Sequence, residues 1–295
     1  MLDAARARRP RLGAGAGPLI GLRISLGPAL WRIGPAWAVL AGALSGSISF
    51  LPHASPLQLV GAALLADSAW GVLWRLTALD EDPTPDPQTQ AGLLPFFQEQ
   101  SPAGRALGTL RRVAAGASWV EVAAALALNT VLCLLLGLPA LIITVMAGAM
   151  ILWGWALTQA GKQPAACDAL LNTGLPWLLG VVLVQPALTP VHLAAATPAL
   201  VLGVAFTALQ WGARRAYLSD GKHMWGAWLG QGAVLLVLVG LREPWILAVV
   251  AALFVLPTWW LWRISDREAI SSGVALTRSS AWWLAAMLLA TLALR

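Results

Sequence analysis

Asp67 is the residue whose type and position point most directly to chemistry. It lies about midway along an apolar stretch, 57–78, and the sequence from residue 66 to residue 74 reads Ala-Asp-Ser-Ala-Trp-Gly-Val-Leu-Trp. A carboxylate within a membrane span is costly, so we expect it to face a polar cavity, to pair with a cation or to stay protonated. A purely structural role, as a hydrogen-bonded core group, remains open for Asp67.

Histidine and cysteine residues provide no second candidate centre. No two of His53, His192 and His223 stand four residues apart, and Cys133 and Cys167 are not in a CxxC pair. Zinc and haem sites need closer groups of these ligands, and two cysteines this far apart do not indicate a disulfide framework. The sequence also lacks a nucleophile elbow, a P-loop and a Rossmann turn.

The elements that must position Asp67 are membrane helices. Hydrophobic residues make up 59% of the chain and charged residues 11%, against roughly 25% charged in soluble domains. Apolar stretches of roughly 18 to 20 residues recur, which is the length of a helical span. The sequence therefore predicts an all-α integral membrane protein with nine transmembrane helices, at 34–51, 57–78, 118–136, 139–159, 170–186, 190–211, 225–241, 244–263 and 279–294.

The basic residues give this topology an orientation. With nine spans, 17 of the 19 Lys and Arg residues fall on one side, and only Arg242 and Arg295 fall on the other. The positive-inside rule then predicts a cytoplasmic N-terminus and a non-cytoplasmic C-terminus in the inner (cytoplasmic) cell membrane. Residues 1–33 become a basic cytoplasmic segment, and 34–295 a helical domain with a long cytoplasmic loop at 79–117. The charges fit anionic headgroups of the bilayer, so we expect no nucleic-acid partner.

This arrangement resembles the UbiA superfamily of intramembrane prenyltransferases, and most closely the chlorophyll and bacteriochlorophyll synthases. The first span, from Pro35 to Gly46, runs through a Trp-Ala pair to a small-residue stretch, as in those enzymes. Ser219-Asp220-Gly221-Lys222 is similar to their second acidic motif. The first acidic motif, Asn-Asp-x-x-Asp-x-x-x-Asp, aligns with residues 66–74. The resemblance implies a UbiA-like helical bundle.

In that family, two acidic motifs hold Mg²⁺, which binds the diphosphate of a prenyl substrate. Carried over, the resemblance leaves Asp67 and Asp220 as metal ligands if the protein is active, because Trp70 and Trp74 replace the other two aspartates of the first motif. A separate group, Asp80, Glu81, Asp82 and Asp86, could supply ligands instead, although a solvated charge run is the simpler interpretation. The candidate substrate- or diphosphate-binding residues are Asp67, Lys162, Arg214, Arg215, Asp220 and Lys222.

Three functions follow from these residues. The loss of carboxylates favours a catalytically silent binding or scaffold subunit of a membrane complex, with a pigment, quinone, carotenoid or prenyl ligand and membrane-protein partners. A divergent Mg²⁺-dependent prenyltransferase acting on an aromatic or tetrapyrrole acceptor is the first alternative. A small-molecule transporter is the second, since Asp67 and a few Gly, Ser and Thr residues lie within the spans. Most of the 17 tryptophans are explained by aromatic belts at the membrane surface.

Overall fold

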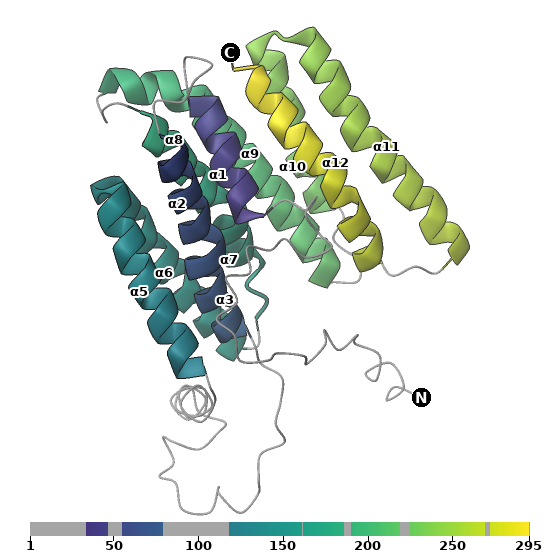
Figure 1. The fold of residues 1–295 in the computed structure, drawn as a ribbon. Helices are drawn as coiled ribbons and strands as arrows, with labels where there is room; N and C mark the ends of the chain where they lie inside the picture. Colours follow the sequence, from purple (N-terminus) through teal and green to yellow (C-terminus); the bar gives the residue numbers. More distant parts are fainter. Residues whose placement is uncertain are drawn as a thin grey trace, which may run out of the picture.

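The computed structural model describes residues 34–46, 55–78, 118–160, 162–185, 190–218, 225–268 and 272–294. These residues form nine continuous helical segments and no strand (Figure 1). The segments are α1 (Pro35–Gly46); α2 (Pro56–Leu64), which continues through a π-helical segment (Leu65–Trp70) into α3 (Gly71–Ala78); α5 (Ser118–Leu136); α6 (Leu138–Gln159); α7 (Ala165–Ala169), which continues through a second π-helical segment (Leu170–Gly174) into α8 (Leu175–Val184); α9 (Pro190–Leu218); α10 (Trp225–Leu241); α11 (Pro244–Glu268); and α12 (Ser272–Leu292).

The all-α prediction is confirmed for the described residues, and each of the nine predicted spans overlaps one helical segment. Four helices are long and apolar enough to cross a membrane, by length and composition: Pro56–Trp74, Leu138–Gln159, Ala165–Val184 and Ala196–Arg215. Several helices extend beyond the predicted spans. The fifth segment begins at Ala165 rather than at 170, and α9 and α11 continue past 211 and 263. An apolar run marks only the part of a helix that hydrocarbon can cover, whereas the helix itself can extend into polar sequence.

Local sequence explains where the helices begin. Ser55 and Gln58 form a capping box, because the Ser55 hydroxyl accepts from the Gln58 N–H and the Gln58 side chain accepts from the Ser55 N–H. Pro56 occupies the first turn, where its missing N–H is not needed. Gly137 separates α5 from α6 with a φ of 87°, a backbone conformation that residues other than glycine rarely adopt.

Two hydrophobic cores organise the described helices. The first core includes buried residues of α9, α10, α11 and α12, and the second includes residues of α2, α5 and α6. Helices α1 and α8 contribute to both, since Ala41 and Trp177 belong to the first core and Val39 and Leu179 to the second. Figure 1 shows α5 and α6 on one side of this shared pair and α11 and α12 on the other.

Helices α1 and α8 approach each other closely through glycine. A methyl group added at Gly180 would overlap the carbonyl oxygen of Val39, and one added at Gly42 would overlap the carbonyl oxygen of Trp177. Helices α9 and α10 meet in the same way at Gly212 and Gly226. Small residues that let backbones approach are typical of helix packing in membranes. Lipid is as apolar as the helix surfaces there, so the hydrophobic effect does not drive helices together and close packing contributes more.

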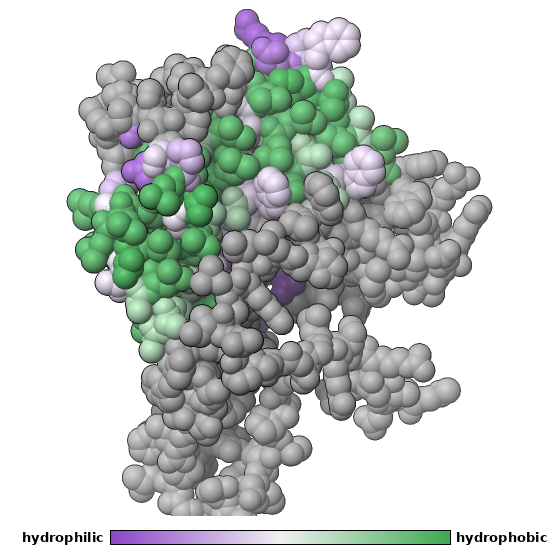
Figure 2. All heavy atoms as spheres, in the orientation of Figure 1, coloured by the Kyte–Doolittle hydropathy of each residue, from purple (hydrophilic) through white to green (hydrophobic). Residues whose placement is uncertain are grey.

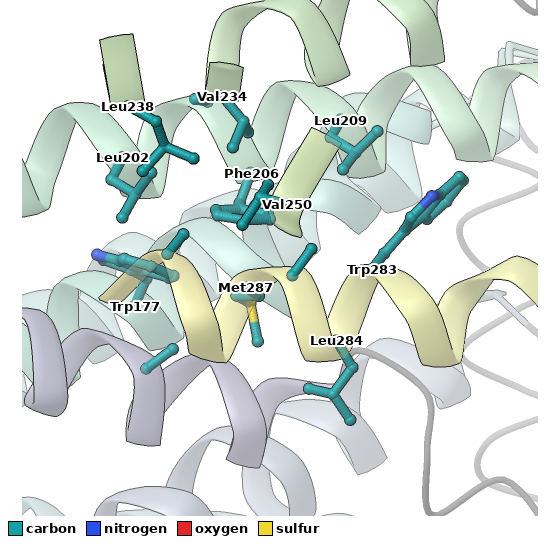
Figure 3. Packing of buried hydrophobic residues seen from close by; sticks show 14 of the residues in the cluster. Trp177, Leu202, Phe206, Leu209, Val234, Leu238, Val250, Trp283, Leu284 and Met287 are labelled. Atoms are coloured by element: carbon teal, nitrogen blue, oxygen red, sulfur yellow. The ribbon is translucent and has the colours of Figure 1, made fainter. Parts of the chain in front are cut away.

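Trp177 fills the centre of the first core. It is 1% exposed, its Nε1 donates to the Ala199 carbonyl oxygen at 2.9 Å, and its ring stacks on Phe206 with centroids 5.9 Å apart. Figure 3 shows Trp177 and Phe206 gathered with Met287 among the apolar side chains of this core. The indole therefore joins α8 to α9 by both shape and hydrogen bonding.

Large apolar side chains also cover outer faces of the helices. On the α5–α6 pair, Leu134, Leu135 and Leu138 are each about two-thirds exposed or more. Figure 2 shows hydrophobic residues spread over the described surface rather than confined to the interior. An extended apolar exterior of this kind is suited to lipid, and with the four apolar helices it characterises a membrane protein.

Candidate functional site

Asp67 lies in the first π-helical segment, Leu65–Trp70, and its side chain is half-buried. This segment contacts the second π-helical segment, Leu170–Gly174, as well as α5 and α1. π-Helical turns are rare and are frequently found at functional sites, because an i→i+5 turn inserts an extra residue and reorients the neighbouring side chains. The sequence-predicted residue and both distortions of the helices therefore lie in one region of the fold.

The two tryptophans after Asp67 take different positions. Trp70 is 2% exposed and belongs to the second core, and its Nε1 has no hydrogen-bond partner among the described residues. Trp74 is half-buried on α3, and its ring lies against Gly154 of α6 so closely that a methyl group there would overlap it. Both indoles thus occupy space between helices, one in the core and one near its edge.

Trp74 reaches a carboxylate that the sequence did not single out, Asp168 of α7. Its Nε1 donates to Asp168 Oδ1 at 3.0 Å. Asn172 Nδ2 donates to the same oxygen at 3.1 Å, and Arg214 Nε of α9 lies 3.1 Å from Asp168 Oδ2. We name these four residues the Asp168 cluster. It links three helical segments that are far apart in the sequence.

The cluster lies near the surface of the bundle. The Asp168 side chain is 17% exposed and that of Arg214 is 44% exposed, so solvent or headgroups screen the ion pair in part. Both oxygens of Asp168 already accept from a donor, and the guanidinium balances its charge. The carboxylate therefore acts in this arrangement as an acceptor shared between helices.

The other predicted site residues that the structure describes are Lys162, Arg214 and Arg215. Lys162 is exposed in the connection between α6 and α7, and Arg214 belongs to the Asp168 cluster. Arg215 contacts two aromatic rings, described below. Asp220 and Lys222 lie outside the described residues, as do the 1–33 segment, the 79–117 loop, the acidic group at 80–86, and His53 and His223.

The Mg²⁺ implied by the family resemblance can be tested against these side chains. Mg²⁺ takes oxygen ligands in near-ideal octahedral geometry. In the described part of the chain, no three His, Cys, Asp or Glu side chains converge on one point. At the position of the motif's third carboxylate, Trp74 offers an N–H donor and no acceptor. The described residues do not fit the metal cluster of the family.

Sequence reasoning missed Asp168 because it placed this residue in the connection before the fifth span, and it did not single out Asn172, which lies within the predicted span 170–186. They stand four residues apart, a spacing that puts side chains on the same face of an α-helix. That spacing would have been informative only if the helix had been expected to begin at Ala165. The ion pair of Arg214 was missed because its partner, Asp168, lies 46 residues earlier in the sequence.

Comparisons with known proteins do not place the chain in a family. No protein-family model matches it, and no curated protein or solved structure gives a significant match. The resemblance to the UbiA superfamily therefore stays a prediction from the residues quoted above.

Breaking the Asp168–Arg214 pair should cost a small, measurable free energy. In a double-mutant cycle of Asp168→Asn and Arg214→Gln, we expect a coupling energy of about 1 kcal/mol in the unfolding free energy, because the pair is partly exposed. Unfolding in detergent, followed by circular dichroism, measures this coupling. A cycle of Asp168→Asn with Lys162→Gln is the control. Equal coupling in both cycles would show that Arg214 stabilises Asp168 only as one more positive charge and not through direct contact.

Proposed function

We propose that this chain is a UbiA-like protein of the inner cell membrane that has lost diphosphate–metal chemistry and serves as a binding or scaffold subunit. In the proposed topology all nine helical segments are transmembrane, with a cytoplasmic N-terminus and a non-cytoplasmic C-terminus. The nine segments overlap the predicted spans, and the segregation of basic residues supports the orientation. The candidate ligand is a prenyl chain, a quinone, a carotenoid or another pigment.

One observation carries the proposal. Trp74, which stands where the family has a metal-binding aspartate, donates its N–H to Asp168, and Arg214 neutralises that carboxylate. Binding Mg²⁺ through Asp168 would require breaking contacts to both residues. The ring of Trp74 also occupies the space beside Gly154. Asp168 thus holds helices together instead of being available to a metal and a diphosphate.

An apolar ring at the same place supports a binding role. Trp74 adds a half-buried indole surface next to the first π-helical segment, whereas a carboxylate there would need hydration or a cation. Isoprenoid and pigment ligands are themselves apolar, so they would be stabilised by contacts that repel a diphosphate. This complementarity is the reason for preferring a ligand of that class.

The test is an assay of the purified full-length chain in mild detergent. We expect no transfer from an allylic prenyl diphosphate, with or without Mg²⁺, and no Mn²⁺ retained by electron paramagnetic resonance when Mn²⁺ replaces Mg²⁺. The Asp67→Asn variant should behave like the wild type in both measurements. Mg²⁺-dependent transfer that Asp67→Asn abolishes would disprove the proposal and establish the prenyltransferase.

The same preparation identifies the ligand. Solvent extracts analysed by mass spectrometry, together with the visible absorption spectrum of the protein, should contain an isoprenoid or pigment in a fixed ratio to the chain. A Trp74→Ala variant should lose much of it, whereas a Trp153→Ala variant, with an exposed ring removed, should retain it. Equal retention in both variants would place the ligand elsewhere or show that it is carried by the detergent.

A further inference from the structure

Arg215, in the last turn of α9, is held between two indole rings. Its Cζ lies 5.7 Å from the ring centroid of Trp211, one turn earlier, and 5.9 Å from that of Trp225, the first residue of α10. Both distances are within the roughly 6 Å range of a cation–π interaction. Trp225 is 48% exposed and Arg215 is half-buried, so this cation sits at the border between the bundle and its surroundings.

The two rings fix the guanidinium without neutralising it. In the part of the chain that the structure describes, the contacts of Arg215 are these two aromatic ones, and no carboxylate pairs with it. Its neighbour Arg214 differs, since that side chain lies on Asp168. A guanidinium carries five N–H donors in its plane and no acceptor. Stacking on ring faces leaves the N–H groups at the edge of a guanidinium able to bind an anion.

The chemistry of this arrangement selects an anion with several oxygens. A guanidinium binds phosphate through two parallel hydrogen bonds, and fixing its orientation beforehand reduces the entropy lost on binding. Tryptophan prefers the headgroup level of a bilayer, with its ring in the interface. In the proposed topology, on which this step rests, Arg215 lies at the cytoplasmic surface, where anionic lipids are concentrated.

We propose that Arg215, oriented by Trp211 and Trp225, binds the phosphate of an anionic phospholipid headgroup. The site needs neither a metal nor a prenyl substrate. It would fix the end of α9 and the start of α10 at the membrane surface. Lipid bound there is thus a structural component of the protein's cytoplasmic face.

The experiment measures lipid retention by the purified full-length chain in detergent. Native mass spectrometry follows titrations with phosphatidylglycerol, with phosphatidylcholine of the same acyl chains, and with inorganic phosphate. We expect saturable retention of phosphatidylglycerol, and about tenfold weaker binding for Arg215→Gln, the factor that corresponds to the loss of one hydrogen bond to a charged group. Trp225→Leu keeps the charge but loses one ring, and should weaken binding by a smaller factor.

Two controls separate this site from general effects. Lys162→Gln removes an exposed positive charge predicted to lie on the same side, and Trp228→Leu removes a 56% exposed ring from the same helix as Trp225. Both should bind like the wild type, and circular dichroism verifies that every variant is folded. The proposal is overturned if Lys162→Gln weakens binding as much as Arg215→Gln, if phosphatidylcholine binds equally, or if inorganic phosphate displaces the lipid.

These outcomes rest on the proposed topology but not on the loss of prenyl transfer. Prenyl transfer by the chain would end the scaffold proposal but would leave headgroup binding by Arg215 untouched. Loss of lipid selectivity would end the present inference without restoring any metal chemistry.

Discussion

A single methyl group at Gly180 is expected to destabilise the protein by about 2–3 kcal/mol, although Gly→Ala normally stabilises a helix by up to about 1 kcal/mol. The added Cβ of Gly180→Ala would overlap the carbonyl oxygen of Val39 and come 2.7 Å from the backbone nitrogen of Ala43. Both are backbone atoms, so neither can rotate away. Helices α1 and α8 would have to separate, and these two helices belong to both cores.

Gly232→Ala is the matched control. Gly232 lies within α10, and an added Cβ there meets no atom within 4 Å. We expect this variant to be as stable as the wild type or slightly more stable, so the two substitutions should shift stability in opposite directions. Thermal or denaturant unfolding in detergent, followed by circular dichroism at the helix band, gives the difference. Equal effects at Gly180 and Gly232 would contradict the close contact between α1 and α8.

Trp177→Ala should have the largest effect of any substitution considered, a loss of about 3–5 kcal/mol in unfolding free energy. The substitution removes a side chain that is 1% exposed and stacked on Phe206, and it leaves a cavity between α8 and α9. It also removes the hydrogen bond to the Ala199 carbonyl oxygen. Gly203 lies directly against the indole, and as a glycine it has no side chain that could fill the cavity.

Two further tryptophan variants separate the causes. Trp153→Ala removes a ring that is 62% exposed, and it should change stability by no more than about 0.5 kcal/mol. Trp177→Phe keeps an aromatic ring but no N–H. The loss of unfolding free energy that the smaller ring does not explain therefore measures the hydrogen bond to Ala199. If Trp153→Ala and Trp177→Ala were equally destabilising, the first core would not be organised around Trp177.

The helical framework was predictable because long apolar runs leave strong signals in a sequence. Continuous apolar runs with proline and glycine between them located all nine segments, and Gly137 with Pro139 marked the turn between α5 and α6 correctly. Helices α9 and α11 end later than the predicted spans. Hydropathy falls where a helix leaves the apolar region, but the backbone hydrogen bonds of the helix continue.

The candidate site was less predictable. Asp67 was found because a charge in an apolar run is conspicuous, but nothing in Leu65–Trp70 distinguishes a π-helical turn from an ordinary one. The role of Trp74 depends on Asp168, 94 residues later, and such a pairing is decided by how helices pack rather than by local sequence. The contact of Arg215 with a second ring needs Trp225 from the next helix and could not be inferred from α9 alone.

The contact between α1 and α8 has a consequence for biosynthesis. The Gln185 side chain donates to the carbonyl oxygen of Gly46, and the two residues are 139 positions apart. At the ribosome's rate of about 5–20 residues per second, α1 is made roughly 7–28 s before the end of α8 follows it. During that interval the first helix lacks the partner that its glycine fits. A chaperone or insertase that shelters small-residue helices would act at this stage, on a nascent chain whose halves cannot yet be joined.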